Sequence, residues 1–262
     1  MGLTRFAIDI AAKNEKIESF DSYLFIGPHP DDIEIGAGAT ISKLIKLGKK
    51  VTFLICTDGR YGKENIGRPI SCEELIEIRH QECLDSAKYL GVEDIRFLNL
   101  SDGNQYSYRE LLEGIAKAIN DVKPDIVFAP DPDVPSECHA DHLNVGKAAK
   151  ELANFANYGE IFEKYLPQGE TLNEGINVKA IALFMTAKPN KFVRTYGHFH
   201  RQIETLYLHS SQYPKGHPAT KSVVLYLKLR ATEFGLLRFS IPSEGFRMMN
   251  RTRMHCLPEA YK

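Results

Sequence analysis

The stretch FIGPHPDDIEIGAGAT (residues 25–40) joins the end of a short apolar run to the start of a helical pattern. The run SYLFIG, residues 22–27, is bounded by turn residues and therefore indicates a buried strand. His29, Asp31 and Asp32 follow it at once, and the two glycines after Ile35 would let the backbone turn into a helix. The stretch predicts a strand, a tight polar turn and a helix, which is the repeating unit of an α/β domain.

The same alternation continues along the chain. Apolar runs indicate further strands at residues 51–57, 94–100 and 123–130. Amphipathic patterns indicate helices at residues 38–50, 71–91, 108–122 and 139–156, and Ser71 with Glu74 predicts a capping box. This order implies a Rossmann-like, mostly parallel sheet flanked by helices, whose ligands bind beyond the carboxyl ends of the strands.

The pattern changes after about residue 158. Further strands are indicated at residues 178–186, 190–195 and 245–255. A helix is indicated in the first part of residues 198–214, and another at residues 223–237. Because no linker or repeat separates the halves, we expect residues 1–262 to form a single domain. A core at about residues 20–157 would be followed by a C-terminal subdomain, about residues 158–262, that extends the same sheet.

Composition excludes several classes of protein. The net charge of -1, with both signs mixed along the chain, does not indicate a nucleic-acid-binding face. No run approaches the roughly 18 apolar residues of a membrane span, and residues 1–20 suggest a short amphipathic helix too charged for a secretory signal. Five cysteines without a CxxC pair favour reduced thiols in a cytoplasmic protein.

The turn HPDD places metal-ligand chemistry at the end of the first strand. His29 and Asp32, three residues apart, can converge on one zinc or similar divalent ion. Asp31 between them would point elsewhere, where a carboxylate beside a metal-bound water can act as a general base. The alternative is an ordinary strand-to-helix turn whose aspartates cap the helix.

The motif HADH, residues 139–142, follows the fourth strand. His139 and His142 share a face of the starting helix, so one could be the third metal ligand and the other could stabilise charge, oriented by Asp141. Two histidines and an aspartate with an open fourth position suit a hydrolytic zinc site. Unrelated histidines at a surface helix start are the alternative, and Cys138 is expected to be buried or uninvolved.

Other catalytic motifs are weak or absent. The segment GAGAT resembles a dinucleotide-binding turn, but it lacks the third glycine and a clear ribose-binding acid. No G-x-S-x-G elbow supports acyl transfer by a serine.

With these motifs in order, the sequence resembles the LmbE-like, or PIG-L, family of zinc-dependent de-N-acetylases. The matching segments are PHPDDIEIGAGAT, TDGRYG, IRHQECLDSAKYLGV, LSDG, HADH and EGF. Pro28, Ile33 and Ala140 stand where Ala, Glu and Pro are usual. Segments of the second half, such as LHSSQYP and EGFRMMNRTRMH, are most similar to archaeal diacetylchitobiose deacetylases, and deacetylases of N-acetylglucosaminyl malate share many of them.

The resemblance implies a role for each matching residue of the centre. The zinc ligands would be His29, Asp32 and His142. Asp31 would be the general base, and His139, held by Asp141, would stabilise the oxyanion. The implied reaction is hydrolysis of the N-acetyl group of a small N-acetylglucosamine-containing sugar, with another acylated amino-sugar conjugate as the alternative. A non-catalytic sugar-binding module is a third possibility, against which an intact Asp31 argues.

Three further residues receive roles from the resemblance alone. Arg79 and Asp102 would hold the sugar, and His255 would reach the site of a neighbouring subunit, which implies a homo-oligomer, a hexamer in the chitobiose enzymes. The simpler interpretations also stand: Arg79 as a solvent-facing helix residue paired with Glu82, Asp102 as a turn residue before a glycine, and His255 as an ordinary strand residue.

Overall fold

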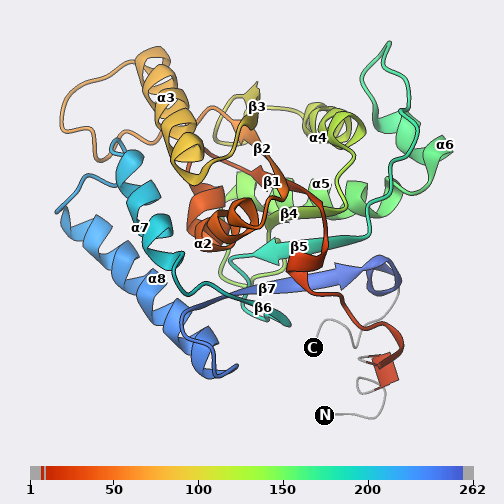
Figure 1. Cartoon of the computed structure of the whole chain (residues 1–262). Helices are drawn as coiled ribbons and strands as arrows, with labels where there is room; N and C mark the ends of the chain where they lie inside the picture. Colours follow the sequence, from red (N-terminus) through yellow and green to blue (C-terminus); the bar gives the residue numbers. More distant parts are fainter. Residues whose placement is uncertain (1–6, 9, 256–262) are drawn as a thin grey trace.

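The computed structural model describes residues 7–8 and 10–255. In this part of the chain seven strands form one sheet, in the order β3-β2-β1-β4-β5-β7-β6 (Figure 1). Strands β1 to β5 run parallel, and β7 is antiparallel to both β5 and β6. The strands are β1 (Ser22–Gly27), β2 (Lys50–Thr57), β3 (Asp94–Leu100), β4 (Ile126–Pro130), β5 (Ala180–Phe184), β6 (Lys191–Arg194) and β7 (Ser243–Asn250). The expected mostly parallel α/β sheet is confirmed.

Helices cover both faces of the sheet because the strand residues are apolar on both sides. In β1, Tyr23 and Phe25 pack on the face of α2 (Asp32–Lys46) and α3 (Cys72–Leu90). Leu24 and Ile26 pack on the opposite face with α4 (Tyr108–Val122) and α5 (Ala140–Phe155). Such two-sided burial is typical of a parallel sheet.

The C-terminal half extends this sheet and adds a second row of helices. Beside α2 and α3 lies α7 (Phe199–Leu208), and α8 (Pro218–Leu236) packs next to it (Figure 1). The short elements are η1 (Ile17–Ser19), α6 (Gly159–Phe162), η2 (Glu163–Tyr165) and η3 (Arg251–Met254). No helix within the described residues is long and apolar enough to cross a membrane.

Several expected boundaries are wrong. Helix α2 begins at Asp32, six residues before the expected residue 38, so the HPDD turn adjoins it directly. Gly36 lies inside this helix, where a Cβ would come within 2.3 Å of the Phe184 ring. This glycine therefore allows close packing of helix and sheet, and it does not form the turn.

The two ends of the chain also differ from expectation. The closing strand stops at Asn250, whose side chain accepts a hydrogen bond from the N–H of Arg253 and so begins η3. The expected N-terminal helix falls partly on residues 1–6 and 9, outside the described residues.

The helix caps also differ from expectation. Ser71 caps α3 by accepting a hydrogen bond from the N–H of Glu74, which is half of the expected capping box. A full capping box forms at Ser107 and Glu110 of α4.

The strand order reverses between β1 and β4. Helices α2 and α3 connect strands on one side of β1, whereas the chain crosses to the other face through α4 before β4. In sheets of this kind, ligands usually bind at the carboxyl ends of the strands beside such a reversal. Both candidate motifs lie on this side of the sheet: HPDD directly follows β1, and HADH lies in the connection from β4 to α5 and at the start of α5.

Candidate metal centre and active site

Three expected ligands meet beside the reversal of strand order between β1 and β4. His29 lies in the turn after β1, Asp32 is the first residue of α2, and His142 is in the first turn of α5. Nδ1 of His29 and Nε2 of His142 lie 3.0 and 3.4 Å from Oδ2 of Asp32. One ligand atom from each residue lies within 4.8 Å of the others. A single ion could contact all three.

The HPDD turn is closed by its own polar groups. The backbone N–H of His29, the residue before Pro30, donates to Oδ2 of Asp32 at 2.9 Å. This hydrogen bond joins the first and last residues of HPDD and closes the turn. Asp31 is left with φ of 138°, a conformation that residues other than glycine rarely adopt. Backbone strain of this kind is concentrated at functional sites.

Arg79 of α3 binds the Asp31 carboxylate. Its Nη2 donates to Oδ2 of Asp31 at 3.1 Å and to the carbonyl of Pro30 at 2.9 Å, and Nη1 donates to the carbonyl of Gly59 at 3.0 Å. Burial raises the pKa of Asp31 to about 6, although the charge of Arg79 opposes the shift. The interpretation of Arg79 as a solvent-facing residue is wrong, since the side chain is buried.

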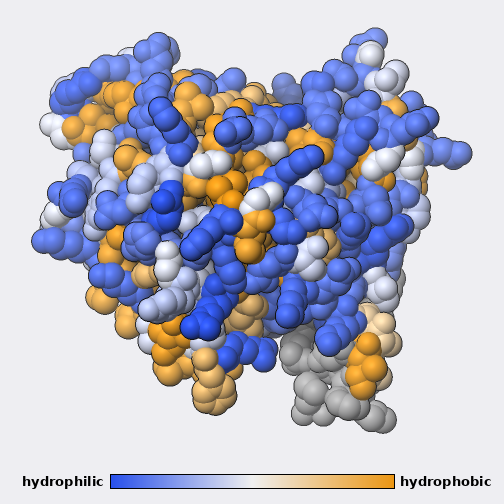
Figure 2. Space-filling model, in the orientation of Figure 1, coloured by the Kyte–Doolittle hydropathy of each residue, from blue (hydrophilic) through white to orange (hydrophobic). Residues whose placement is uncertain are grey.

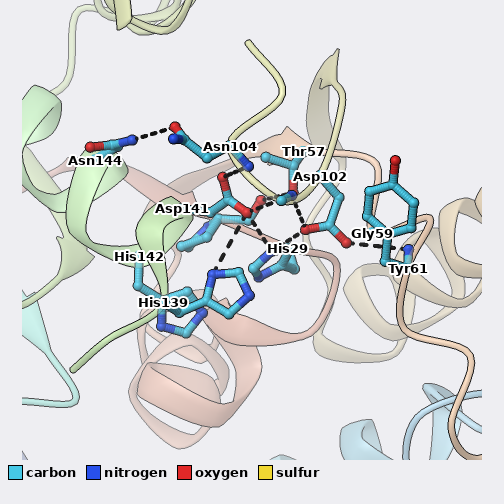
Figure 3. A network of polar contacts seen from close by, with 12 residues as sticks. His29, Thr57, Gly59, Tyr61, Asp102, Asn104, His139, Asp141, His142 and Asn144 are labelled. Carbon is cyan, nitrogen blue, oxygen red and sulfur yellow. Dashed lines mark hydrogen bonds and ion pairs between the residues drawn. The ribbon is translucent and has the colours of Figure 1, made fainter. Parts of the chain in front are cut away.

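The second nitrogen of His29 faces two other carboxylates. Nε2 lies 3.0 Å from Oδ1 of Asp102 and 3.4 Å from Oδ2 of Asp141 (Figure 3). Asp141 also accepts the backbone N–H groups of Gly103 and Asn104, each at 2.9 Å. The loop after β3 is thus tied to the start of α5 beside His29.

His139 is the most open member of the cluster. Its side chain is 47% exposed, and Nδ1 lies 3.6 Å from Oδ2 of Asp141. The ring stacks on that of His142 with centroids 5.0 Å apart (Figure 3). His139 thus faces Asp141 within ion-pair distance, and its expected role at the oxyanion stays a prediction.

Sequence reasoning missed Glu137. Its Oε2 lies 3.0 Å from Nδ1 of His142, and its Oε1 accepts the backbone N–H of His139 at 2.7 Å. The carboxylate orients His142 so that Nε2 faces Asp32. A carboxylate next to a possible histidine ligand is the signal that could have indicated it.

The donor set fits a divalent transition metal. Burial disfavours charge on these groups, but His142 and His29 hold the pKa of Asp32 well below its usual value, and Asp32 raises the pKa of His142 to about 9. An ion would replace the protons that balance these charges, because histidine binds metals in its neutral form. Two imidazoles and a carboxylate, each imidazole supported by a further carboxylate, suit zinc and similar ions.

Two residues lie apart from this cluster. His255 follows β7, which runs antiparallel to β5, so it lies near the amino ends of the parallel strands. Its Nε2 lies 3.2 Å from the hydroxyl of Tyr158. The expectation that it acts in a neighbouring subunit therefore stays a prediction. Cys138 is exposed and belongs to neither possible metal group among the described residues.

Fold and site together describe a Rossmann-like α/β protein with a His-Asp-His group that could hold a metal and a separate buried carboxylate beside it. Comparison with known proteins narrows the class. The model of the PIG-L family, GlcNAc-PI de-N-acetylase, matches residues 24–153. The diacetylchitobiose deacetylase of Thermococcus kodakarensis is 31% identical over 253 residues, which cover 95% of this chain and 90% of the relative. The chain belongs to the PIG-L family and is a deacetylase.

Two further relatives show how much of the chain is shared with each kind of deacetylase. The solved N,N'-diacetylchitobiose deacetylase of Pyrococcus horikoshii, in complex with an inhibitor, is 33% identical with a TM-score of 0.84, and the match covers 98% of this chain and 93% of that one. A probable N-acetyl-alpha-D-glucosaminyl L-malate deacetylase 2 of Bacillus cereus is 32% identical over 132 residues, or 48% of this chain and 57% of the relative. The resemblance found in the sequence is confirmed.

Proposed function

We propose that the enzyme removes the N-acetyl group from a small N-acetylglucosamine-containing sugar of the diacetylchitobiose type, giving acetate and a free amine. The observation that carries this proposal is the extent of similarity. The diacetylchitobiose deacetylases match nearly the whole chain, including its second half, whereas the malate-conjugate deacetylase matches about half. Residues of the second half contact the surroundings of Arg79: the Gln212 amide donates to the carbonyl of Gly62, and the Ser211 hydroxyl donates to Glu82. The extra match therefore supports a shared substrate class.

We propose zinc as the metal, held by Nδ1 of His29, Oδ2 of Asp32 and Nε2 of His142, with another divalent transition ion as the alternative. Bound there, it would supply a Lewis acid for the acetamide carbonyl and an activated water. The ligand set of two imidazoles and one carboxylate supports this choice.

The chain's own residues supply the proton transfers. Asp31, held by Arg79 beside the metal group, accepts the proton of the attacking water and later returns it to the leaving amine. His139, supported by Asp141, donates a hydrogen bond to the acetamide oxygen as negative charge develops on it. General-base catalysis contributes typically about 10²–10⁴-fold, and one oxyanion donor about 10²–10³-fold.

The direct test is acetate release by the zinc-loaded protein from N-acetylglucosamine, diacetylchitobiose and N-acetylglucosaminyl malate. Asp31→Asn is the control, and we expect it to retain zinc while kcat falls by about 10²–10⁴-fold. Release from diacetylchitobiose, lost in the control, would support the proposal. Preference for the malate conjugate would move the enzyme to the alternative substrate class, and full activity of Asp31→Asn would remove Asp31 as the base.

The remaining proposals concern the whole chain. We propose that it forms one domain, in which the second half supplies β5, β6 and β7 to the sheet, and that it assembles as a homo-oligomer, with a hexamer as the expected form. Exposed apolar side chains on α8 support an assembly, as does the distance of His255 from its own site. The four described cysteines are free thiols, which supports a cytoplasmic location.

A further inference from the structure

Tyr61 is an aromatic residue that the loop after β2 presents beside the site. It is 52% exposed, and its backbone N–H donates to Oδ2 of Asp102 at 3.3 Å. The ring lies next to Gly103, where a Cβ would come within 3.4 Å of it. Figure 3 shows the ring beside Asp102, with its hydroxyl pointing away from His29. About half of this large side chain therefore remains open to water next to the site.

A single exposed tyrosine is common on protein surfaces, so the way in which this one is held matters more than its exposure. Gly59 and Gly62 enclose it in the sequence, and both pack on the buried guanidinium of Arg79. A Cβ would lie 2.3 Å from Nη1 of Arg79 at Gly59 and 2.9 Å from it at Gly62. The backbone on both sides of Tyr61 is thus pressed against a fixed side chain, and only glycine allows this approach.

Further contacts hold the rest of the loop. Arg60 pairs with Asp58, with 2.5 Å between Nη2 and Oδ2. Gln212, which follows α7, donates to the carbonyl of Gly62 at 2.7 Å, and its own carbonyl accepts from the Asn65 amide at 2.7 Å. A rigid loop therefore presents the Tyr61 ring. An aromatic group that is already held in place loses little conformational freedom when a ligand covers it.

The place of the ring relative to the metal group indicates which part of a substrate it would meet. The acetamide of the reacting sugar has to reach the group formed by His29, Asp32 and His142. Asp102, to which the family resemblance assigns a sugar contact, faces His29 with one oxygen and Tyr61 with the other. Tyr61 thus lies beyond Asp102 as seen from the metal group. A group attached to the reacting sugar would extend into this position.

A second sugar ring suits an aromatic face. N-acetylglucosamine in a β-linkage has its polar substituents around the edge of the ring and C–H groups on both faces. The face of an aromatic ring is electron-rich and attracts such polarised C–H groups, and covering both surfaces removes apolar area from water. A malate group is charged and has no face of this kind.

We propose that Tyr61 is a specificity-determining residue whose ring stacks on the second sugar of a disaccharide substrate. The proposal rests on the proposed function and adds to it the residue that would distinguish diacetylchitobiose from free N-acetylglucosamine. The rigid loop, the exposed ring and its place beyond Asp102 carry it.

The first test compares two substrates in zinc-loaded wild type, Tyr61→Phe and Tyr61→Ala. Both variants keep the N–H that donates to Asp102. We expect Tyr61→Ala to lower kcat/KM for diacetylchitobiose by about tenfold, mainly through KM, and to change that for N-acetylglucosamine by less than about twofold. Tyr61→Phe keeps the ring and should stay within about twofold of the wild type on both sugars.

Tyr196→Ala is the matched control. Tyr196 is 71% exposed and follows β6, which lies at the far end of the sheet order. We expect this variant to keep the wild-type preference between the two sugars. An equal fall on both sugars in Tyr61→Ala would overturn the proposal, because it would show a general role of the loop. Unchanged kinetics in Tyr61→Ala would overturn it as well.

Binding is measured separately from turnover. The chain has no tryptophan, so Tyr61→Trp places a single fluorescent indole in the loop. The variant is combined with Asp31→Asn, which we expect to bind substrate without turnover, and is loaded with zinc. Diacetylchitobiose should then shift the indole emission to shorter wavelength, because the second sugar excludes water from the ring, and N-acetylglucosamine should leave the emission nearly unchanged. Diacetylchitobiose that binds by calorimetry without changing the emission would overturn the proposal.

The proposed function and the role of Tyr61 fail in different ways. Absence of acetate release by the wild type from either sugar would contradict the proposed function. The emission shift with diacetylchitobiose would still support the sugar contact of Tyr61 in that case, and its absence would overturn it. Acetate release that Tyr61→Ala slows equally for both sugars would leave the proposed function intact and overturn the role of Tyr61 alone.

Discussion

Asp31 and Asp32 are adjacent in the chain, yet the structure gives their carboxylates different partners. Asp32 closes the HPDD turn and joins the two histidines. Asp31, at φ of 138°, turns to Arg79, which supplies three hydrogen bonds at this corner of the site. The backbone at Asp31 thus gives the proposed metal ligand Asp32 and the Asp31 carboxylate separate partners.

His29→Ala and His139→Ala should separate zinc binding from catalysis. The two rings lie 4.7 Å apart, but only His29 belongs to the proposed ligand set. We expect His29→Ala to lose most of its zinc and His139→Ala to keep about one zinc per chain, while both lose activity. The zinc content of dialysed protein, measured by atomic spectroscopy, checks this. Full zinc content in His29→Ala would remove it from the ligand set.

The meeting of His29, Asp32 and His142 could be predicted from the sequence, and the residues that support them could not. His29 and Asp32 stand directly after one predicted strand, and His142 stands at the start of the helix that follows another. Parallel-sheet topology therefore brings all three to the carboxyl ends of the strands. Arg79 comes from α3, and its approach to Asp31 depends on how that helix packs over the β1 loop. Such contacts are determined by tertiary packing and leave no local pattern in the sequence.

At the level of elements, α2 is the helix that connects the site to the second half of the chain. Glu244 of β7 accepts the backbone N–H groups of Ala39 and Thr40, at 3.2 and 2.6 Å, and the Gln202 amide of α7 donates to the carbonyl of Ile35. Backbone groups in the middle of a helix normally pair with each other. The predicted start of this helix was wrong because Gly36 was interpreted as a turn residue. It lies inside the helix, where the lack of a side chain allows close packing against Phe184 of β5.

Glu244 should make stability depend on pH. Burial raises its pKa to about 7, while in the unfolded chain it would be near 4.3. Between these values the unfolded state has lost a proton that the folded state retains, so this residue's contribution to stability falls as pH rises. We expect wild-type protein to lose up to about 3 kcal/mol relative to Glu244→Gln between pH 4 and 8. Urea unfolding of both proteins checks this, and parallel pH profiles would contradict it.

For the whole molecule, the outward face of α8 is unusually apolar. Leu225, Leu229 and Leu236 are each more than half exposed, and Phe239 just beyond the helix is fully exposed. Figure 2 shows hydrophobic side chains gathered at the bottom of the molecule, over the end of α8. Exposed apolar side chains gathered on one helix are typical of a protein–protein contact, and a second copy of this chain is the partner we propose.

Leu225→Glu with Leu229→Glu should weaken the assembly. A charge in a buried apolar contact has no partner, so we expect the mass from light scattering to shift toward smaller species at micromolar concentration. Leu47→Glu, which changes an exposed leucine at the end of α2, is the control and should keep the wild-type mass. A monomeric wild type, or a double variant of unchanged mass, would contradict the role of α8.

His255 extends the same reasoning to activity. It lies near the amino ends of the parallel strands, whereas the proposed metal group of its own chain lies at their carboxyl ends. A catalytic contribution therefore requires the site of another copy. Asp31→Asn and His255→Ala should then each be weakly active alone. Mixed during refolding, they would form some sites in which an intact Asp31 meets an intact His255 from its neighbour. We expect such mixtures to recover up to about a quarter of wild-type activity, as random pairing allows. Activity equal to the average of the two separate variants would show that His255 does not act across subunits.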